Sequence, residues 1–69
     1  MLGKPKFELN DKVSFTLQEK TIEGVVYIVD AYGTFENPNE VSYDVFSDDE
    51  NVLYKHIPER LVKKVKNKN

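Results

Sequence analysis

Few side chains in this chain are of the kinds that carry out covalent chemistry. His56 is the only histidine, cysteine is absent, and Ser14, Ser42 and Ser47 stand in no recognisable catalytic motif. Nucleophilic catalysis needs a nucleophile beside a base, and acid–base catalysis needs two groups whose pKa values are held apart. A single histidine inside a predicted strand cannot fill these roles. The sequence therefore predicts no catalytic residues and a protein that is not an enzyme.

The acidic run Asp48–Asn51 has the composition of a cation-binding loop but lacks its spacing. A calcium loop alternates oxygen ligands with spacer residues around a central glycine. Here the four polar residues are consecutive and no glycine separates them. Runs of this kind are typical of hairpin turns. We expect a solvated turn, no metal-ligating residues and no cofactor.

A stretch between two predicted strands combines aromatic and acidic side chains, and Pro38 stiffens it. An acidic loop beside exposed aromatics can hold a basic or Pro-containing peptide, and tyrosine offers contact area at low entropic cost. Alternatively, its aromatic side chains fold back onto a core that needs every apolar group. The candidate peptide-binding residues are Asp30, Tyr32, Phe35, Glu36 and Glu40.

Basic residues gather toward the C-terminus and define a second candidate surface, which could bind the phosphates of a nucleic acid. Residues 21–50 hold eight acids and no base, whereas residues 51–69 hold six bases and one acid. This asymmetry predicts a dipolar surface. Against nucleic acid, the net charge is −2 and only one arginine is present. The candidate residues are Lys12, Arg60, Lys63, Lys64, Lys66 and Lys68.

Period-two alternation of apolar and polar residues predicts the strands that would position these side chains. Gly24 is the expected bend of the longest strand, whose β-branched content favours a strand over a helix. Pro58 presets the backbone for one 3₁₀ turn over 58–61. The expected strands are 12–17, 21–32, 41–46, 52–57 and 61–65.

The 69 residues predict a single domain with an ordered part of about residues 9–65 and a frayed tail at 66–69. A chain this short buries a modest core, so a substitution such as Leu61→Ala should cost about 2–5 kcal/mol. The expected core residues are Val13, Phe15, Ile22, Val26, Ile28, Tyr43, Val45, Leu53, Ile57, Leu61 and Val65.

Composition also limits where the protein works and what it meets. The absence of cysteine suits a reducing compartment, and the first residues lack the apolar run of a signal peptide. No apolar stretch is long enough to span a bilayer. We expect a cytoplasmic monomer or weak dimer whose partner is another protein or a nucleic acid, with no membrane association and no small-molecule substrate.

Three segments, NDKVSF, EGVVYIVD and YDVFSDDENVLYKHIPERLVKKV, together resemble the SH3-like small β-barrels of the bacterial, Tudor and KOW types. The ending Ile57-Pro58-Glu59-Arg60-Leu61-Val62 is similar to the turn that leads into the last strand of those modules. The chain is also similar to small proteins of bacteriophages and other mobile elements. The resemblance implies an all-β, five-stranded SH3-like barrel with one 3₁₀ turn before the last strand.

The chain departs from these families in the residues that bind their ligands. It has no tryptophan for a signalling SH3 groove, and its loops are acidic where a ribosomal KOW module would be basic. Most of its aromatic residues stand at core-like positions rather than in a methyl-lysine cage. The resemblance therefore implies a fold and a binding role, without a specific ligand.

Overall fold

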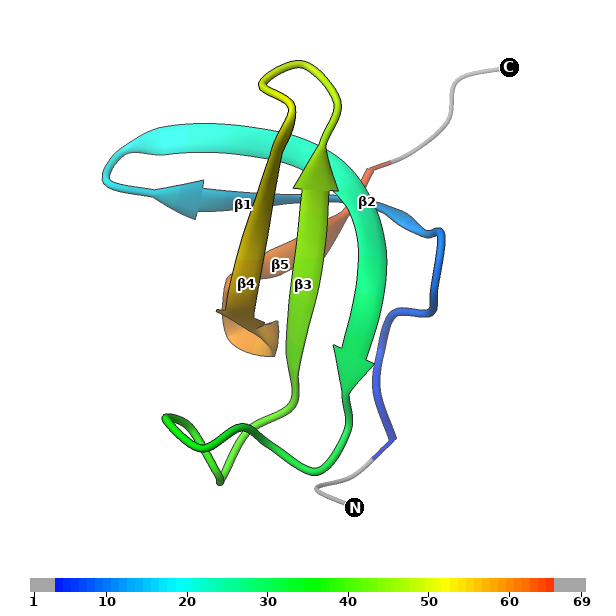
Figure 1. Cartoon of the computed structure of the whole chain (residues 1–69), viewed down its shortest axis with the longest axis vertical. Helices are drawn as coiled ribbons and strands as arrows, with labels where there is room; N and C mark the ends of the chain where they lie inside the picture. The colour runs from blue at the N-terminus through cyan, green and yellow to red at the C-terminus, as the bar shows by residue number, and fades with distance from the viewer. Residues whose placement is uncertain (1–3, 66–69) are drawn as a thin grey trace.

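Five antiparallel strands make one continuous sheet in the computed structural model, which describes residues 4–65 (Figure 1). Their order in the sheet is β4-β3-β2-β1-β5. The predicted all-β fold, with a 3₁₀ turn before the last strand, is confirmed. The predicted tail, 66–69, lies outside the described residues. The elements are β1 Lys12–Leu17, β2 Lys20–Asp30, β3 Ser42–Ser47, β4 Val52–Pro58, the 3₁₀ helix η1 Glu59–Leu61 and β5 Val62–Lys64.

The sheet is bent rather than closed by hydrogen bonds. The first strand β1 pairs with the last strand β5, with Phe15 opposite Val62. Within residues 4–65, β4 and β5 pair with β3 and β1 respectively and not with each other. The turn η1 connects these two end strands. Among the same residues, no helix is long and apolar enough to traverse a lipid bilayer.

Strand β2 holds the two halves of the sheet together. Residues Lys20–Val25 pair with β1, and residues Val25–Asp30 pair with β3. Figure 1 shows the strand curving strongly between these partners. Gly24 lies next to Val25, where the pairing of β2 passes from β1 to β3. A Cβ atom at Gly24 would be 2.3 Å from the carbonyl oxygen of Phe46. Glycine therefore allows the backbones of β2 and β3 to approach closely at this position.

The core lies on the concave side of this bent sheet. Tyr43 is fully buried at its centre, and the ring of Phe7 meets it edge-on with the ring centroids 5.5 Å apart. The lead-in to β1 therefore contributes to the core, which also contains Val41 and Val62. The buried hydrophobic residues are Phe7, Val13, Phe15, Ile22, Val26, Val41, Tyr43, Val45, Ile57 and Val62.

Two predicted core residues are exposed, and two β-bulges explain both errors. Ile28 is 48% exposed and Leu53 is 37% exposed. In β2 the register shifts after Val26, so that Val29 rather than Ile28 turns to the core. In β4 a shift opposite Asp44 turns Tyr54 inward in place of Leu53.

An extra residue in one strand reverses the alternation of every position beyond it. The remaining predicted core residues, Leu61 and Val65, are half-buried.

Candidate functional site

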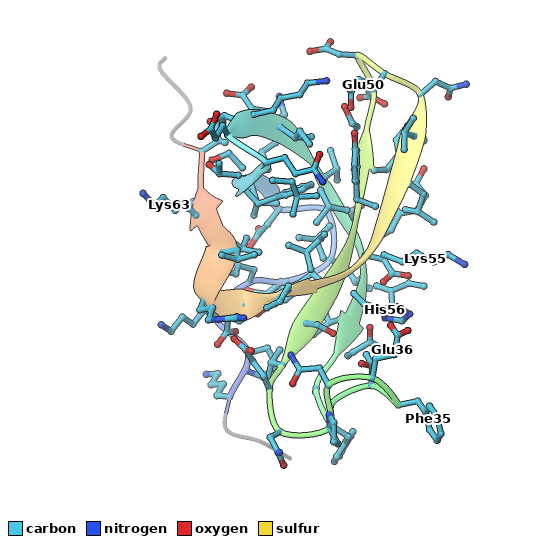
Figure 2. All side chains as sticks on the ribbon, turned by 90° about the vertical axis from the view of Figure 1, so that its left-hand side faces the viewer. Phe35, Glu36, Glu50, Lys55, His56 and Lys63 are labelled. Carbon is cyan, nitrogen blue, oxygen red and sulfur yellow. The ribbon has the colours of Figure 1, made fainter. Side chains whose placement is uncertain are left out.

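The loop between β2 and β3 lies at the opposite end of the sheet from the β3–β4 turn (Figure 1). Both of its aromatic side chains are outside the core: Tyr32 is 75% exposed, and Phe35 is fully exposed at 103% of its reference area. Figure 2 shows Phe35 pointing away from the rest of the protein. The possibility that these rings complete a small core is therefore wrong.

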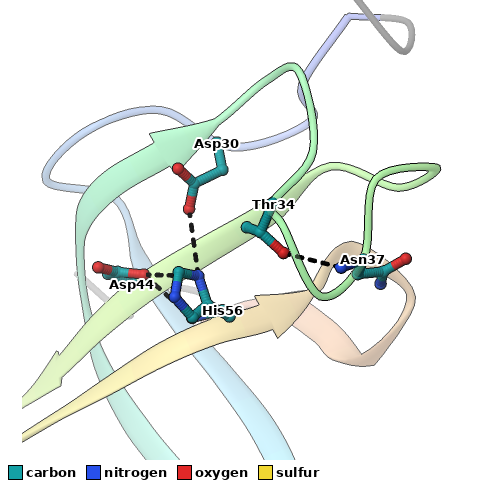
Figure 3. Close-up of polar contacts among 5 residues, drawn as sticks. All are labelled: Asp30, Thr34, Asn37, Asp44 and His56. Carbon is teal, nitrogen blue, oxygen red and sulfur yellow. Dashed lines mark hydrogen bonds and ion pairs between the residues drawn. The ribbon is translucent and has the colours of Figure 1, made fainter.

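The tip of the loop is a turn closed by its own hydrogen bonds. The Thr34 N–H donates to the Asn37 carbonyl over 3.1 Å, and the Asn37 N–H donates to the Thr34 carbonyl over 3.2 Å. The Asn37 N–H also reaches the Thr34 hydroxyl at 3.0 Å (Figure 3). Phe35 and Glu36 are the two central residues of this turn, and both are exposed. The turn therefore exposes an aromatic and an acidic side chain of consecutive residues to solvent.

Gly33 lets the loop pack closely before the turn. Its φ is +86°, a conformation that residues with a Cβ atom rarely adopt, and an added Cβ would lie 2.6 Å from the Pro38 carbonyl oxygen. Only glycine fits this position without moving the backbone of Pro38. The shape of the loop therefore depends on glycine at position 33 as well as on the strands that the loop connects.

Glu40, another predicted binding residue, anchors the loop instead of presenting a free charge. Its carboxylate accepts the Arg60 backbone N–H over 3.2 Å and lies 3.5 Å from the Arg60 guanidinium. It also accepts the Asn37 side-chain amide over 3.2 Å. Because Arg60 lies in η1, this contact ties the loop to the turn before β5.

Asp30 belongs to a separate cluster that the sequence did not predict. Its Oδ2 atom lies 3.8 Å from Nδ1 of His56, and the same nitrogen lies 3.9 Å from Oδ1 of Asp44 (Figure 3). The three side chains come from the adjacent strands β2, β3 and β4. The signal in the sequence was Asp44, an acid between the apolar residues Tyr43 and Val45 of a strand. Its proximity to His56 depends on strand register.

The basic residues predicted to bind nucleic acid, where they fall within residues 4–65, lie in different surroundings. Arg60 pairs with Glu40, and the Lys64 ammonium lies 3.4 Å from Asp11. The Glu8 N–H, and to a lesser degree Lys64, hold the pKa of Asp11 below its ordinary value.

Lys12 and Lys63 are exposed. Lys63 is opposite Ser14, which is itself opposite Glu23 on the other side. Glu23, an acid, therefore lies in the same row of cross-strand neighbours as Lys63. Lys66 and Lys68 lie outside the described residues.

Ion pairs also mix the two charge classes that the sequence separates. Besides the Arg60–Glu40 pair, Lys20 and Glu50 form an ion pair near the β3–β4 turn, where the Tyr54 hydroxyl also donates to Glu50. These two contacts lower the pKa of Glu50. Of these pairs, Arg60–Glu40 joins a base of residues 51–69 to an acid of residues 21–50, whereas Lys20 lies in neither segment. The dipolar surface stays a prediction.

No protein-family model matches this chain, and neither a curated protein nor a solved structure resembles it significantly. The functional interpretation below therefore depends on the geometry of the chain itself.

Proposed function

We propose that this protein is a non-catalytic protein-interaction module of the SH3-like type, and that the tip of its β2–β3 loop binds a basic, Pro-containing segment of another protein. The observation that carries the proposal is the full exposure of Phe35 on a turn closed by its own hydrogen bonds. The contact residues are Tyr32, Phe35 and Glu36. The strand order and the 3₁₀ turn before β5 support the SH3-like interpretation.

The Phe35 side chain is fully exposed, so packing within the fold does not explain a phenylalanine at this position. Burying such a side chain against a partner is worth about 1.5–3 kcal/mol. Because the turn is already ordered by the Thr34–Asn37 hydrogen bonds, binding loses less conformational entropy than it would with a flexible loop. Large aromatics held in this way are typical of the few residues that dominate an interface.

The charges of the loop select a basic partner. Within residues 31–41 the ionisable acids are Glu36 and Glu40, and no basic residue is present. Glu40 is already paired with Arg60, so Glu36 is the acid that remains for a ligand. An arginine or lysine of the partner can contact the carboxylate of Glu36 and the faces of the neighbouring rings together. Proline in the same segment would present these groups on an extended, stiff backbone.

A peptide titration followed by NMR tests the proposal. A synthetic peptide containing lysine, arginine and proline is expected to shift the backbone signals of residues 31–40. Phe35→Ala should weaken its binding at least about tenfold. The same substitution should change the free energy of unfolding by less than about 0.5 kcal/mol, because the ring packs against nothing.

The matched control is Val52→Ala, since Val52 is exposed at the far end of the sheet. This variant should bind the peptide as the wild type does. Equal affinity of Phe35→Ala and the wild type would refute the assignment of the site. Absence of loop shifts at millimolar peptide would refute the ligand class.

Nucleic-acid binding through the lysines remains the alternative proposal, and the geometry supports it less. Arg60 and Lys64 are already paired with carboxylates. Affinity for random-sequence DNA or RNA that falls steeply with salt, together with shifts at Lys12 and Lys63, would favour this alternative.

A further inference from the structure

Asp30, Asp44 and His56 bring one ligand atom each to within 4.8 Å of one another. We propose that they bind a single divalent transition-metal ion, for which Zn²⁺ is the best fit. This inference is independent of peptide binding by the loop tip. It rests on an imbalance of buried charge, on an orphaned oxygen atom and on the spacing of the donors.

The cluster places a buried carboxylate, Asp44, beside a half-buried one, Asp30, whose side chain is 27% exposed. The Asp44 side chain is only 6% exposed. Among residues 4–65, neither Asp30 nor Asp44 has a lysine or arginine within ion-pair distance, and their one basic neighbour is His56. A buried carboxylate is costly unless a cation or several hydrogen bonds compensate it. A divalent ion would compensate both carboxylates together.

An oxygen atom of Asp30 supplies the second, independent observation. Its Oδ2 is buried and has no hydrogen-bond partner among the described residues. Buried polar atoms in folded proteins nearly always have a partner, and an orphan points to a bound water or ion. The same oxygen faces Nδ1 of His56 across 3.8 Å (Figure 3). The unpartnered oxygen is thus one of the atoms that face each other in the cluster.

The spacing of the donor atoms suits a small ion. Nδ1 of His56 lies 3.8 Å from the Asp30 oxygen and 3.9 Å from the Asp44 oxygen. Ligands about 2.0–2.2 Å from a tetrahedral zinc ion lie roughly 3.3–3.6 Å apart. Binding therefore requires the two distances from His56 to close by a few tenths of an ångström, and the two carboxylate oxygens, which lie within 4.8 Å of each other, to close by up to about 1.5 Å. Asp30 ends β2 and His56 is 43% exposed on its side chain, so both have room to adjust.

The backbone already fixes two of the three donors. The His56 N–H donates to Oδ1 of Asp44 over 3.0 Å, which orients that carboxylate. Hydrogen bonds of this kind to a ligating carboxylate are common around metal sites. His56 itself has a φ of +60°, at the point where β4 bulges opposite Asp44. This bulge turns the imidazole toward the two acids of the neighbouring strands.

The donor set distinguishes among metals. Calcium takes six to eight oxygen ligands, and magnesium retains several waters around a few carboxylates. An imidazole nitrogen with two carboxylate oxygens suits zinc and its first-row neighbours. Three protein ligands leave at least one coordination position for water. The ion would connect β2, β3 and the edge strand β4, and its stabilisation of the folded state would rise with the logarithm of its concentration above Kd.

The test uses the untagged, full-length chain with ZnCl₂ as the probe. Thermal melts and calorimetry should show one bound ion, and an increase in melting temperature on the order of 10 °C at a hundredfold excess over Kd. Because the chain has a single histidine, its imidazole nitrogens give one pair of NMR signals. Zn²⁺ should shift the Nδ1 signal strongly, and EDTA should reverse the change.

Two variants remove ligands without disturbing the backbone. His56→Asn keeps a residue that tolerates positive φ, and Asp30→Asn keeps the shape of the side chain. Each should lower the zinc affinity at least tenfold. The matched control is Asp48→Asn, which makes the same change of charge at an exposed acid of the β3–β4 turn and should bind zinc as the wild type does.

Three results would overturn the proposal. The first is an unchanged melting temperature and unchanged imidazole signals in excess Zn²⁺. The second is equal zinc affinity in the wild type and both ligand variants, which would place the ion elsewhere. The third is coordination through Nε2 of His56 instead of Nδ1, which the orientation in Figure 3 does not allow with both acids.

Discussion

Alkaline pH should destabilise this protein through one buried hydroxyl group. The Tyr43 side chain is fully buried; its hydroxyl donates to Glu59 and accepts the Phe7 N–H over 3.3 Å. The same Glu59 oxygen accepts the Lys6 N–H over 2.9 Å. Burial, and then the hydrogen bond to Glu59, raise the pKa of Tyr43 from 10.0 to about 12. This hydroxyl therefore also holds the segment before β1 against the core.

The magnitude follows from the difference between the two pKa values. Above pH 10 the unfolded chain loses the Tyr43 proton while the folded protein retains it until about pH 12. The unfolded state then binds fewer protons, so the free energy of unfolding falls as the pH rises. The full contribution is present below pH 10 and is lost by about pH 12, a total of about 2.7 kcal/mol. For a domain with roughly 5 kcal/mol of stability this is a large fraction.

Urea melts of the wild type and Tyr43→Phe across this pH range measure the effect. The variant loses a hydrogen bond to a charged group and should be about 2 kcal/mol less stable near neutral pH. Its stability should fall less steeply above pH 10, so the two curves should converge by about pH 12. Tyr32→Phe is the matched control, because Tyr32 is 75% exposed and should behave as the wild type.

A constant difference between the wild type and Tyr43→Phe from neutral to strongly alkaline pH would refute the reasoning. It would mean that Tyr43 ionises alike in the folded and unfolded chain. Tyrosinate absorbance provides an independent check, since Tyr43, one of the four tyrosines, should keep its proton until about pH 12 or until the protein unfolds. The hydrogen bond to Glu50 also raises the pKa of Tyr54.

Two further substitutions test the bend of the sheet and the lead-in to β1. Gly24→Ala should destabilise the protein by at least about 2 kcal/mol in denaturant melts, because its Cβ would lie 2.3 Å from the Phe46 carbonyl oxygen; the neighbouring Glu23→Ala is the control, and equal stability of the two variants would contradict the close approach. Asp11→Asn should make stability less sensitive to acid, because the wild-type carboxylate, whose pKa the Glu8 N–H lowers, contributes stability above its ordinary pKa of 3.8 and loses it as the pH falls below that value. Identical acid-unfolding curves for Asp11→Asn and the wild type would contradict this role.

The sequence predicted the strands because each has a strong local pattern. The alternation over Lys12–Leu17 gave the bounds of β1 correctly, and the other four strands differ from their predicted limits by one or two residues. Pro58 located the 3₁₀ turn because its ring restricts φ whatever the fold. Gly24 marked the bend because only a residue without a side chain allows another backbone so close. Such signals are local, so they can be recognised in the sequence without knowledge of the tertiary structure.

The loop tip was only partly predictable. Tyr32, Phe35 and Glu36 were recognised as candidates from composition, and the structure places all three in solvent. The same composition did not show that Glu40 pairs with Arg60 or that Asp30 lies beside His56, because Arg60 is in η1 and His56 is in β4. Long-range pairing of charged groups leaves no local pattern to read.

The amino-acid sequence by itself determined the all-β class, the positions of the strands along the chain and the turn that precedes the last one. Only the tertiary structure decided the register, through the bulges in β2 and β4 on either side of Asp44. A one-residue bulge exchanges the two faces of a strand, so it exposed Ile28 and Leu53 and brought His56 to the two aspartates. The physical reason is that periodicity specifies which residues alternate, whereas cross-strand hydrogen bonds and packing decide where the alternation is interrupted.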